Sequence, residues 1–446
     1  MAATSPEPIH ALQIPEILEL IARYVPLFYS LDDDDRDTMD PSHLYSCILV
    51  SHQWHQCFLP HLYHYYDDRV MGSMAMPIFI LRKHAHLIRR YICLAEVQTL
   101  LDLQPKSLLG LHTNTTLAGW RPAMDHLLLK CGHQLRELTL SGTGFSEELK
   151  DDRLQALMHL PYLEELRLMR WRISTEALRG ILNGCSANLS ILSLGTISGF
   201  NEHAFGPWTG TSYSKEQEQE PQHWPWLSKL RVLQMTLDFI QSPASIHLPR
   251  ICPALETVRL IVDQDDDFDL TVLSRTLREH CPKLDSIMYT ESYSMRNEYG
   301  FFPQSTIYAA LFKDSTRKLR SATLSLPEGM DDEMLEALLS QAATLEAIEL
   351  RCARSCSMGM SDIIKILASC ARLKSVVLLE ANCPSRDLDQ LLTQPWACQN
   401  LQTLKIDGLG DGKGLEDGTV RVRLLEHMRK SGLGHVRDVS RTMDAH

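Results

Sequence analysis

Long apolar runs are missing from this sequence of 446 residues. The longest, Met71 to Leu81, lies between Arg69 and Arg82 and is shorter than the roughly 20 residues that a helix needs to span a bilayer. The first residues also lack a basic segment followed by an apolar core, which is the pattern of a secretory signal peptide. We therefore expect no membrane partner and a location in the cytoplasm, the nucleus or both.

Basic residues are also fewer than acidic ones. The sequence has 44 Lys and Arg and 56 Asp and Glu, which gives a formal net charge of −12. An excess of acid argues against a general binder of nucleic acid or of anionic lipid. The 12 cysteines come without a secretory signal, which favours a reducing compartment over a disulfide-bonded one. The expected partners are therefore other proteins.

Recognisable catalytic motifs are absent as well. The sequence contains no G-x-x-x-x-G-K-[ST], no G-x-S-x-G and no H-E-x-x-H, and no G-x-G-x-x-G that follows a strand. The pair Cys352 and Cys356 lacks a second cysteine pair at zinc-finger spacing, so a metal site is not favoured. We expect a protein that is not an enzyme and that needs no cofactor.

A repeated phrase dominates what is present. Leu135 to Leu140 reads L-x-x-L-x-L, and related phrases begin at nine later positions, with starts 28, 26, 41, 25, 29, 35, 26, 28 and 28 residues apart. The steps are close to the period of about 20–29 residues that is typical of leucine-rich repeats. The ten copies start at Leu135, Leu163, Leu189, Leu230, Leu255, Leu284, Leu319, Leu345, Leu373 and Leu401.

The repeats predict an α/β fold, a leucine-rich-repeat solenoid with a curved parallel sheet and outer helices. Each phrase is followed by a helical pattern, so successive strands must be joined by crossovers and run parallel. We assign residues 87–446 to this part, with about 10–11 repeats, a degenerate first strand at 88–93 and a final capping helix at 419–430. The polar stretch 111–116 favours a loop.

Six cysteines share one place in the repeat, three or four residues before its first leucine. A small, weakly polar side chain suits the corner between a helix end and the next strand, where Cys behaves as a buried apolar residue. Successive copies stand a full repeat apart, which favours packing over metal or disulfide roles. The six are Cys131, Cys185, Cys252, Cys281, Cys370 and Cys398.

Side chains between the apolar positions of each phrase point toward the concave face of the predicted sheet, because successive residues of a strand alternate between its two faces. Their mixed charge and apolar members suit a protein target better than a phosphate or a sugar. The target-binding residues that we predict on this basis are Arg167, Met169, Arg259, Met288, Glu349 and Arg351.

The amino-terminal segment, residues 1–66, differs from the repeats. Residues 14–25 have apolar side chains at helical spacing, with Pro15 in the first turn, where its missing N–H costs nothing. Residues 43–50 and 51–59 are also compatible with helices. An acidic insert, residues 31–37, favours a solvated loop over a cation site, and residues 67–86 are expected to link this module to the repeats.

This segment resembles the F-box family. The resemblance rests on Ile14-Pro15-Glu16-Ile17-Leu18 with Ile21 and Val25, then on Leu44, Cys47, Val50-Ser51-His52-Gln53-Trp54 and Leu62-Tyr63, over about 50 residues. The acidic insert replaces the short loop that is usual in the family. The resemblance implies a three-helix module that docks the Skp-type adaptor of a cullin ubiquitin ligase. The positions that match the family's motif, and are implied to serve adaptor contact or internal core, are Pro15, Ile17, Leu18, Ile21, Leu44, Val50 and Trp54.

Three functions follow in decreasing order of preference. The first is the substrate-recognition subunit of an SCF-type ubiquitin ligase, in which the F-box-like module binds the adaptor and the repeats bind a target protein. The second is a repeat scaffold, or a regulator of an enzyme such as a small GTPase, whose first helices only cap the repeats. The third is a cysteine enzyme.

Overall fold

The structure is a computed structural model of the whole chain. It describes residues 12, 14–25, 28–30, 37–68, 77–93, 97–114, 122–142, 148–149, 156–195, 224–236, 245–262, 270–291, 305–313, 318–326, 329–352, 359–379, 388–406 and 426. The chain divides into two compact units, Met1–Leu189 and Ser190–His446. Within the described part, no helix is both long and apolar enough to cross a membrane.

The first unit begins with three helices, α1 (Pro15–Tyr24), α2 (Ser42–Ile48) and α3 (His52–His64). Pro15 occupies the first turn of α1, as its fixed φ favours. Ser51 accepts a hydrogen bond from the backbone amide of Trp54 and caps α3. All three helices predicted from the sequence are therefore present. A short antiparallel pair, β1 (Phe28–Ser30) and β2 (Asp37–Met39), brackets the acidic insert, of which residues 31–36 lie outside the described residues.

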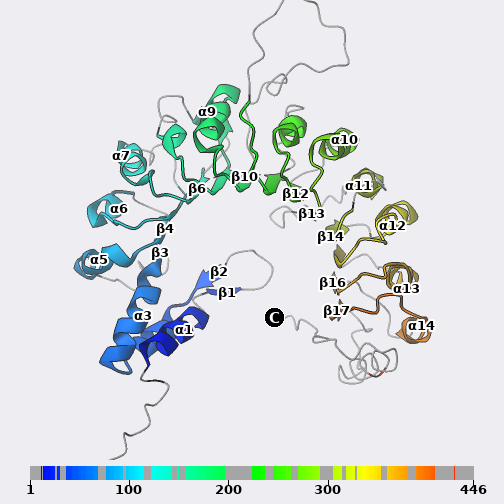
Figure 1. Cartoon of the computed structure of the whole chain (residues 1–446), viewed down its shortest axis with the longest axis horizontal. Helices are drawn as coiled ribbons and strands as arrows, with labels where there is room; N and C mark the ends of the chain where they lie inside the picture. The colour runs from blue at the N-terminus through cyan, green and yellow to red at the C-terminus, as the bar shows by residue number, and fades with distance from the viewer. Residues whose placement is uncertain are drawn as a thin grey trace, which may run out of the picture. The chain divides into compact units, whose positions relative to one another are not determined.

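Five parallel strands follow in the first unit, in the order β3–β4–β5–β6–β8, and helices lie on one side of them (Figure 1). A two-stranded parallel pair, β7 (Glu148–Leu149) with β9 (Arg172–Ile173), lies apart from this ladder. The strands are β3 (Tyr65–Asp67), β4 (Arg90–Cys93), β5 (Gly110–Asn114), β6 (Glu137–Ser141) and β8 (Glu165–Met169), and the helices are α5 (Ile78–His84), α6 (Val97–Leu103), α7 (Pro122–Cys131) and α9 (Thr175–Cys185).

Eight strands of the second unit, β10 to β17, pair in parallel and in sequence order. Helices α10 to α14 all lie on the same side of these strands (Figure 1). The strands are β10 (Ile191–Gly195), β11 (Val232–Thr236), β12 (Thr257–Val262), β13 (Ser286–Glu291), β14 (Ser321–Leu326), β15 (Ala347–Cys352), β16 (Ser375–Leu379) and β17 (Thr403–Ile406), and the helices are α10 (Leu270–His280), α11 (Ser305–Phe312), α12 (Asp332–Leu339), α13 (Met360–Ser369) and α14 (Leu388–Thr393).

All ten repeat phrases coincide with a strand, and their apolar residues form the core. Leu135, Leu138 and Leu140 are at most 1% exposed, and the corresponding residues of later repeats are buried in the same way. Neighbouring strands align these positions, because Leu138 lies opposite Leu166 and Leu140 opposite Leu168. Truncating one such leucine to alanine typically costs about 2–5 kcal/mol, so the stacked rows are the main source of stability.

The predicted cysteine corners are confirmed as buried positions. All six thiols lie in the core, and three of them donate to backbone carbonyl oxygens: Cys185 Sγ to Ile181 O at 3.2 Å, Cys252 Sγ to Leu248 O at 3.3 Å and Cys281 Sγ to Pro249 O at 3.4 Å. Cys185 and Cys252 donate to the helix or 3₁₀ turn (Ser245–Ile251) that precedes their own strand, whereas Cys281 donates to that 3₁₀ turn from the next repeat and so links two repeats.

One expectation was wrong. Residues 111–114 belong to strand β5 and not to a loop, because Leu108, Leu111 and Thr113 occupy the three inward positions of a repeat phrase. Thr113 is fully buried, and a threonine at the third position concealed the phrase in the sequence. Residues expected to form a linker, 67–86, contain the end of β3 and helix α5. The expected capping helix at 419–430 lies outside the described residues apart from position 426.

Candidate protein-binding surface

The side of each sheet that faces away from the helices, which we call the strand face, carries every second residue of each strand. In β6 the exposures alternate, with Leu138 and Leu140 buried and Glu137, Thr139 and Ser141 partly exposed between them. Parallel pairing then places equivalent residues side by side. All six residues predicted to bind the target lie on the strand face, Arg167 and Met169 in the first unit and the other four in the second.

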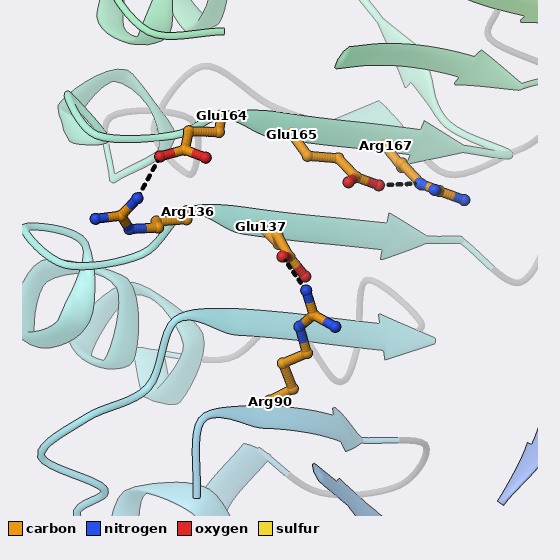
Figure 2. Close-up of polar contacts among 6 residues, drawn as sticks. All are labelled: Arg90, Arg136, Glu137, Glu164, Glu165 and Arg167. Carbon is orange, nitrogen blue, oxygen red and sulfur yellow. Dashed lines mark hydrogen bonds and ion pairs between the residues drawn. The ribbon is translucent and has the colours of Figure 1, made fainter. Parts of the chain in front are cut away.

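Charged side chains on the strand face of the first unit pair with one another (Figure 2). Arg167 forms an ion pair with Glu165 two residues earlier on the same strand, and Arg90 of β4 forms one with Glu137 of β6. The predicted contact residue Arg167 therefore already pairs with a carboxylate of the same chain. A target carboxylate that bound the Arg167 guanidinium would have to compete with Glu165 for it.

The Arg90–Glu137 pair spans an intervening strand. Register places Arg90 opposite Gly110, and Gly110 opposite Glu137. A Cβ atom at Gly110 would lie 3.0 Å from Cγ of Arg90 and 3.2 Å from Oε2 of Glu137. The missing side chain of Gly110 thus leaves the space through which the guanidinium reaches across β5.

The strand face of the second unit has a different charge balance. Glu349 and Arg351 pair along β15, with 3.1 Å between Nε and Oε1. Arg259 of β12 is exposed and Lys405 of β17 is partly exposed, and neither makes an ion pair or a hydrogen bond with any described residue. Partly exposed apolar side chains share this face, among them Ile261, Met288, Val377 and Leu379.

A further charged row was not considered in reading the sequence. Eight of the ten phrases carry a charged residue directly after their first leucine, the exceptions being Ser190 and Gln402, and we call these ten positions the lead row. In the first unit Arg136 pairs with Glu164 at 2.6 Å (Figure 2). In the second unit Arg231 pairs with Glu256 at 2.7 Å and Lys374 with Glu346 at 2.6 Å. Aligning the ten phrases one residue after each first leucine would have revealed the alternation of sign.

Backbone geometry brings the lead row together. The amide of Glu256 donates to the carbonyl of Arg231 at 2.9 Å, and the amide of Glu346 donates to that of Arg320 at 2.8 Å, so members of adjacent repeats are neighbours. The hydrogen bond from Lys374 lowers the pKa of Glu346, whereas partial burial raises the pKa of Asp285 despite the nearby Arg320. These solvated pairs add little stability individually, and they leave the row nearly neutral toward a partner.

The three-helix module presents a second candidate surface. Leu18 and Leu44, both implied by the family resemblance, are 0% and 1% exposed and form the core of the module. Ile17, Ile21 and Trp54 are partly exposed, and the Trp54 ring stacks on Phe58 with centroids 5.0 Å apart. Pro15 is exposed, as is Val50 at 62%.

Several other large apolar side chains of the module are exposed to solvent, although they do not belong to the positions that match the F-box motif. On α1 Leu20 is 52% exposed and Tyr24 is 79% exposed, four residues apart and therefore on one face. At α2 Tyr45 is 56% exposed and Leu49 is 69% exposed, again at a spacing of four. Exposed apolar groups of this size mark places where proteins bind one another.

Metal-ligating and nucleophilic side chains are the remaining candidates for a chemical role in the described residues. No group of three or more His, Cys, Asp or Glu side chains there could hold a metal ion. Burial raises the pKa of the Cys185 and Cys370 thiols to about 12 and that of Cys398 to about 11, which disfavours the thiolate form that a nucleophile needs. These buried thiols are therefore poor nucleophiles.

Each strand from β10 to β17 carries one copy of the repeat phrase and pairs in parallel with the next, and β6 and β8 do the same in the first unit. Both units have the leucine-rich-repeat fold. No protein-family model matches the sequence of this leucine-rich-repeat chain, and no curated protein matches it.

Solved structures that are similar to the chain include the following two. One is the chain in a crystal structure of a TLR13–ssRNA13 complex, with 14% identity over 73% of this chain and a TM-score of 0.27. The other is an internalin (inlF) from Listeria monocytogenes str. 4b F2365, with 12% identity over 82% of this chain and a TM-score of 0.34. The chain spans 55% of the length of the TLR13 chain and 89% of that of the internalin.

Proposed function

We propose that this protein is the target-binding subunit of an SCF-type cullin ubiquitin ligase, in the cytoplasm, the nucleus or both. In this proposal the three-helix module docks a Skp-type adaptor and the strand face of the repeats holds a target protein. The observation that carries the proposal is the set of exposed apolar side chains on α1 and α2, in a module whose sequence resembles the F-box family.

Burial of those side chains supplies the driving force for docking. Leu20, Tyr24, Tyr45, Leu49 and Val50 are each more than half exposed, although Leu18 and Leu44 beside them in sequence are fully packed. Covering apolar surface releases about 25 cal/mol for each Å² removed from water, so five such residues suffice for a stable interface when other contacts are complementary. Their exposure in the isolated chain has a ready explanation if an adaptor covers them.

The role would require no bond chemistry from this chain. A ligase subunit of this kind acts by holding a target lysine close to the loaded conjugating enzyme, which raises its effective concentration. That mechanism agrees with the raised pKa of the buried Cys185 and Cys370 thiols, which makes them unsuited to nucleophilic catalysis. We therefore propose a non-catalytic protein without a cofactor.

Binding of the full chain to a purified Skp-type adaptor tests the proposal. The double variant Leu49→Asp/Val50→Asp places charge on exposed positions of the module and should weaken binding at least about tenfold. The variant Leu129→Asp is a matched control, because Leu129 is 68% exposed on α7, away from the module. A wild-type chain that fails to bind the adaptor, or equal binding by all three proteins, would contradict the proposal. Leu18 is unsuitable for this test, since a charge at a fully buried position would unfold the module.

One observation favours a second function, that of a repeat scaffold or enzyme regulator without a link to ubiquitin. Helix α3 ends at His64 and strand β3 begins at the next residue, where Tyr65 lies opposite Arg90 of β4. The module is thus continuous with the first sheet and could serve only as its cap. Under this function the adaptor would not bind, and deletion of the module would expose the edge of β4 and promote aggregation.

A further inference from the structure

The strand faces of the two units differ in what they leave for a partner. In the first unit the arginines Arg90 and Arg167 are each paired with a carboxylate of the protein. In the second unit only Arg351 is paired in this way, while Arg259 and Lys405 have no partner among the described residues. Among the described residues, the strand face of the second unit therefore carries uncompensated charge, and that charge is positive although the whole chain carries −12.

The two cations lie in one row, five strands apart. Register runs from Arg259 to Met288, then to Thr323, Glu349, Val377 and Lys405. Five strand spacings of about 4.8 Å place the two cations about 24 Å apart. An extended peptide that rises about 3.3 Å per residue covers this distance with about seven residues.

Apolar and small side chains fill the space between the cations. Met288 and Val377 lie in the same row and are partly exposed, and Leu379 follows in the adjacent row. On β14 the strand-face residues Thr323 and Ser325 have small side chains and are only 7% and 9% exposed. Backbone of a bound segment could approach most closely over β14.

We propose that the second unit binds an extended segment of a target protein with two acidic side chains about seven residues apart and apolar side chains between them. The carboxylates would pair with Arg259 and Lys405, and the apolar side chains would cover Met288, Val377 and Leu379. This inference builds on the proposed role as a target-binding subunit and specifies the chemistry of its target. Glu349 lies in the middle of the row, and its charge is balanced by Arg351 of the adjacent row.

Nucleic acid fits the same face less well. A phosphate backbone needs a track of closely spaced cations, and single strands also stack their bases on aromatic side chains. The described strand face of the second unit has two uncompensated cations far apart. The described strands of this unit contain one aromatic residue, Tyr289, which is fully buried on the helix side of the sheet.

Selection from a phage-displayed library of random peptides tests the proposal. Peptides of roughly twelve residues are long enough to span both cations when extended. The full chain is the bait, and the charge-reversed variant Arg259→Glu/Lys405→Glu is the counter-selection bait. We expect enrichment of peptides with two Asp or Glu residues six to eight positions apart and Leu, Val, Ile or Met between them. Enriched peptides that are basic, or that lack a pair of acids, would overturn the proposal.

Affinities of synthetic copies of the enriched peptides provide the second readout. The reversal variant should bind at least about tenfold more weakly, and added salt should weaken binding to the wild type. The control variant Arg275→Glu/Lys283→Glu makes the same change of net charge at exposed positions on helix α10 and in the corner before β13, and should bind as the wild type does. Equal affinities of the wild type and the reversal variant would overturn the proposal.

Two further results separate this proposal from competing ones. Binding of a single-stranded oligonucleotide that is lost in the reversal variant, without any enriched acidic peptide, would overturn it in favour of nucleic acid. Adaptor binding is measured independently through the variant Leu49→Asp/Val50→Asp. Acidic peptides that bind Arg259 and Lys405 support the proposal even if the adaptor does not bind, in which case the ubiquitin role alone would fail.

Discussion

The indole N–H of Trp171 donates a hydrogen bond to the carbonyl oxygen of Leu140 across two adjacent repeats, at 3.0 Å. Trp171 is fully buried just after strand β8, and its ring lies against Gly142 at the end of β6. The backbone around it is bent, since Arg170 has a φ of 59° and a Cβ on Gly142 would lie 2.3 Å from the carbonyl oxygen of Arg170. The Trp171 hydrogen bond therefore links the end of β6 to the turn that follows β8.

Replacing Trp171 by phenylalanine should lower the free energy of unfolding by about 1–3 kcal/mol. The variant leaves a buried carbonyl without this donor and removes part of a large buried ring. Urea denaturation followed by circular dichroism measures the change. Trp226→Phe is the control, because Trp226 is 66% exposed and its loss should change stability by less than about 0.5 kcal/mol. Equal stability of the two variants would show that the Trp171 hydrogen bond is unimportant.

Replacing Gly110 by valine should destabilise the first unit by about 1–3 kcal/mol, because the new side chain occupies the space through which Arg90 reaches Glu137. The same substitution in an Arg90→Ala background should cost less, since the obstructing side chain is gone. The difference between the two costs is the coupling energy of a double-mutant cycle, measured by thermal or urea unfolding. A coupling energy close to zero would mean that Gly110 is needed for another reason.

Native thiol labelling should distinguish buried cysteines from exposed ones. Burial raises the pKa of Cys185 and Cys370 to about 12, so at about pH 8 almost no thiolate is present in the folded protein, and the thiolate is the form that reacts. Because the folded pKa exceeds the unfolded value, raising the pH through the unfolded pKa costs stability, as the unfolded thiols ionise first. Cys47 is partly exposed and serves as the internal reference.

Mass spectrometry after brief treatment with iodoacetamide measures this difference. Cys47 should be modified at least about tenfold faster than Cys185 or Cys370 in the folded protein, and all three should react at similar rates in denaturant. A folded-state rate for Cys185 or Cys370 that equals or exceeds that of Cys47 would contradict the structural role of these corners. It would also revive the hypothesis of a cysteine enzyme.

Most of the strands could be predicted because their signal is local. Leucines at the first, fourth and sixth positions of each phrase point to one side of a strand, and the period between phrases indicates parallel stacking. Strand β5 escaped prediction because Thr113 replaces the apolar residue at the third position, although its side chain is fully buried. The capping of α9 by Ser174, whose Oγ accepts from the amide of Ala177 at 3.1 Å, was predictable for the same local reason.

The candidate surfaces were predictable only in part. Alternation along a strand shows that Arg167 and Arg259 point away from the helices. It cannot show that Arg167 has a carboxylate partner whereas Arg259 has none among the residues that the structure describes. Likewise a match to a helical motif marks both Leu18 and Val50 without revealing that the first is fully buried and the second is 62% exposed. Burial and pairing depend on neighbours that come from other helices and strands.

The amino-acid sequence by itself determined the repeat, the direction of its strands and the inward leucines and cysteines, because these follow from the spacing of apolar residues within a few turns of chain. Tertiary structure decided which surface charges remain available. Arg90 meets Glu137 47 residues away, across a glycine, only after three strands have been brought into register. Such pairings depend on distances in space between residues far apart in the chain, and the order of the residues does not encode those distances directly.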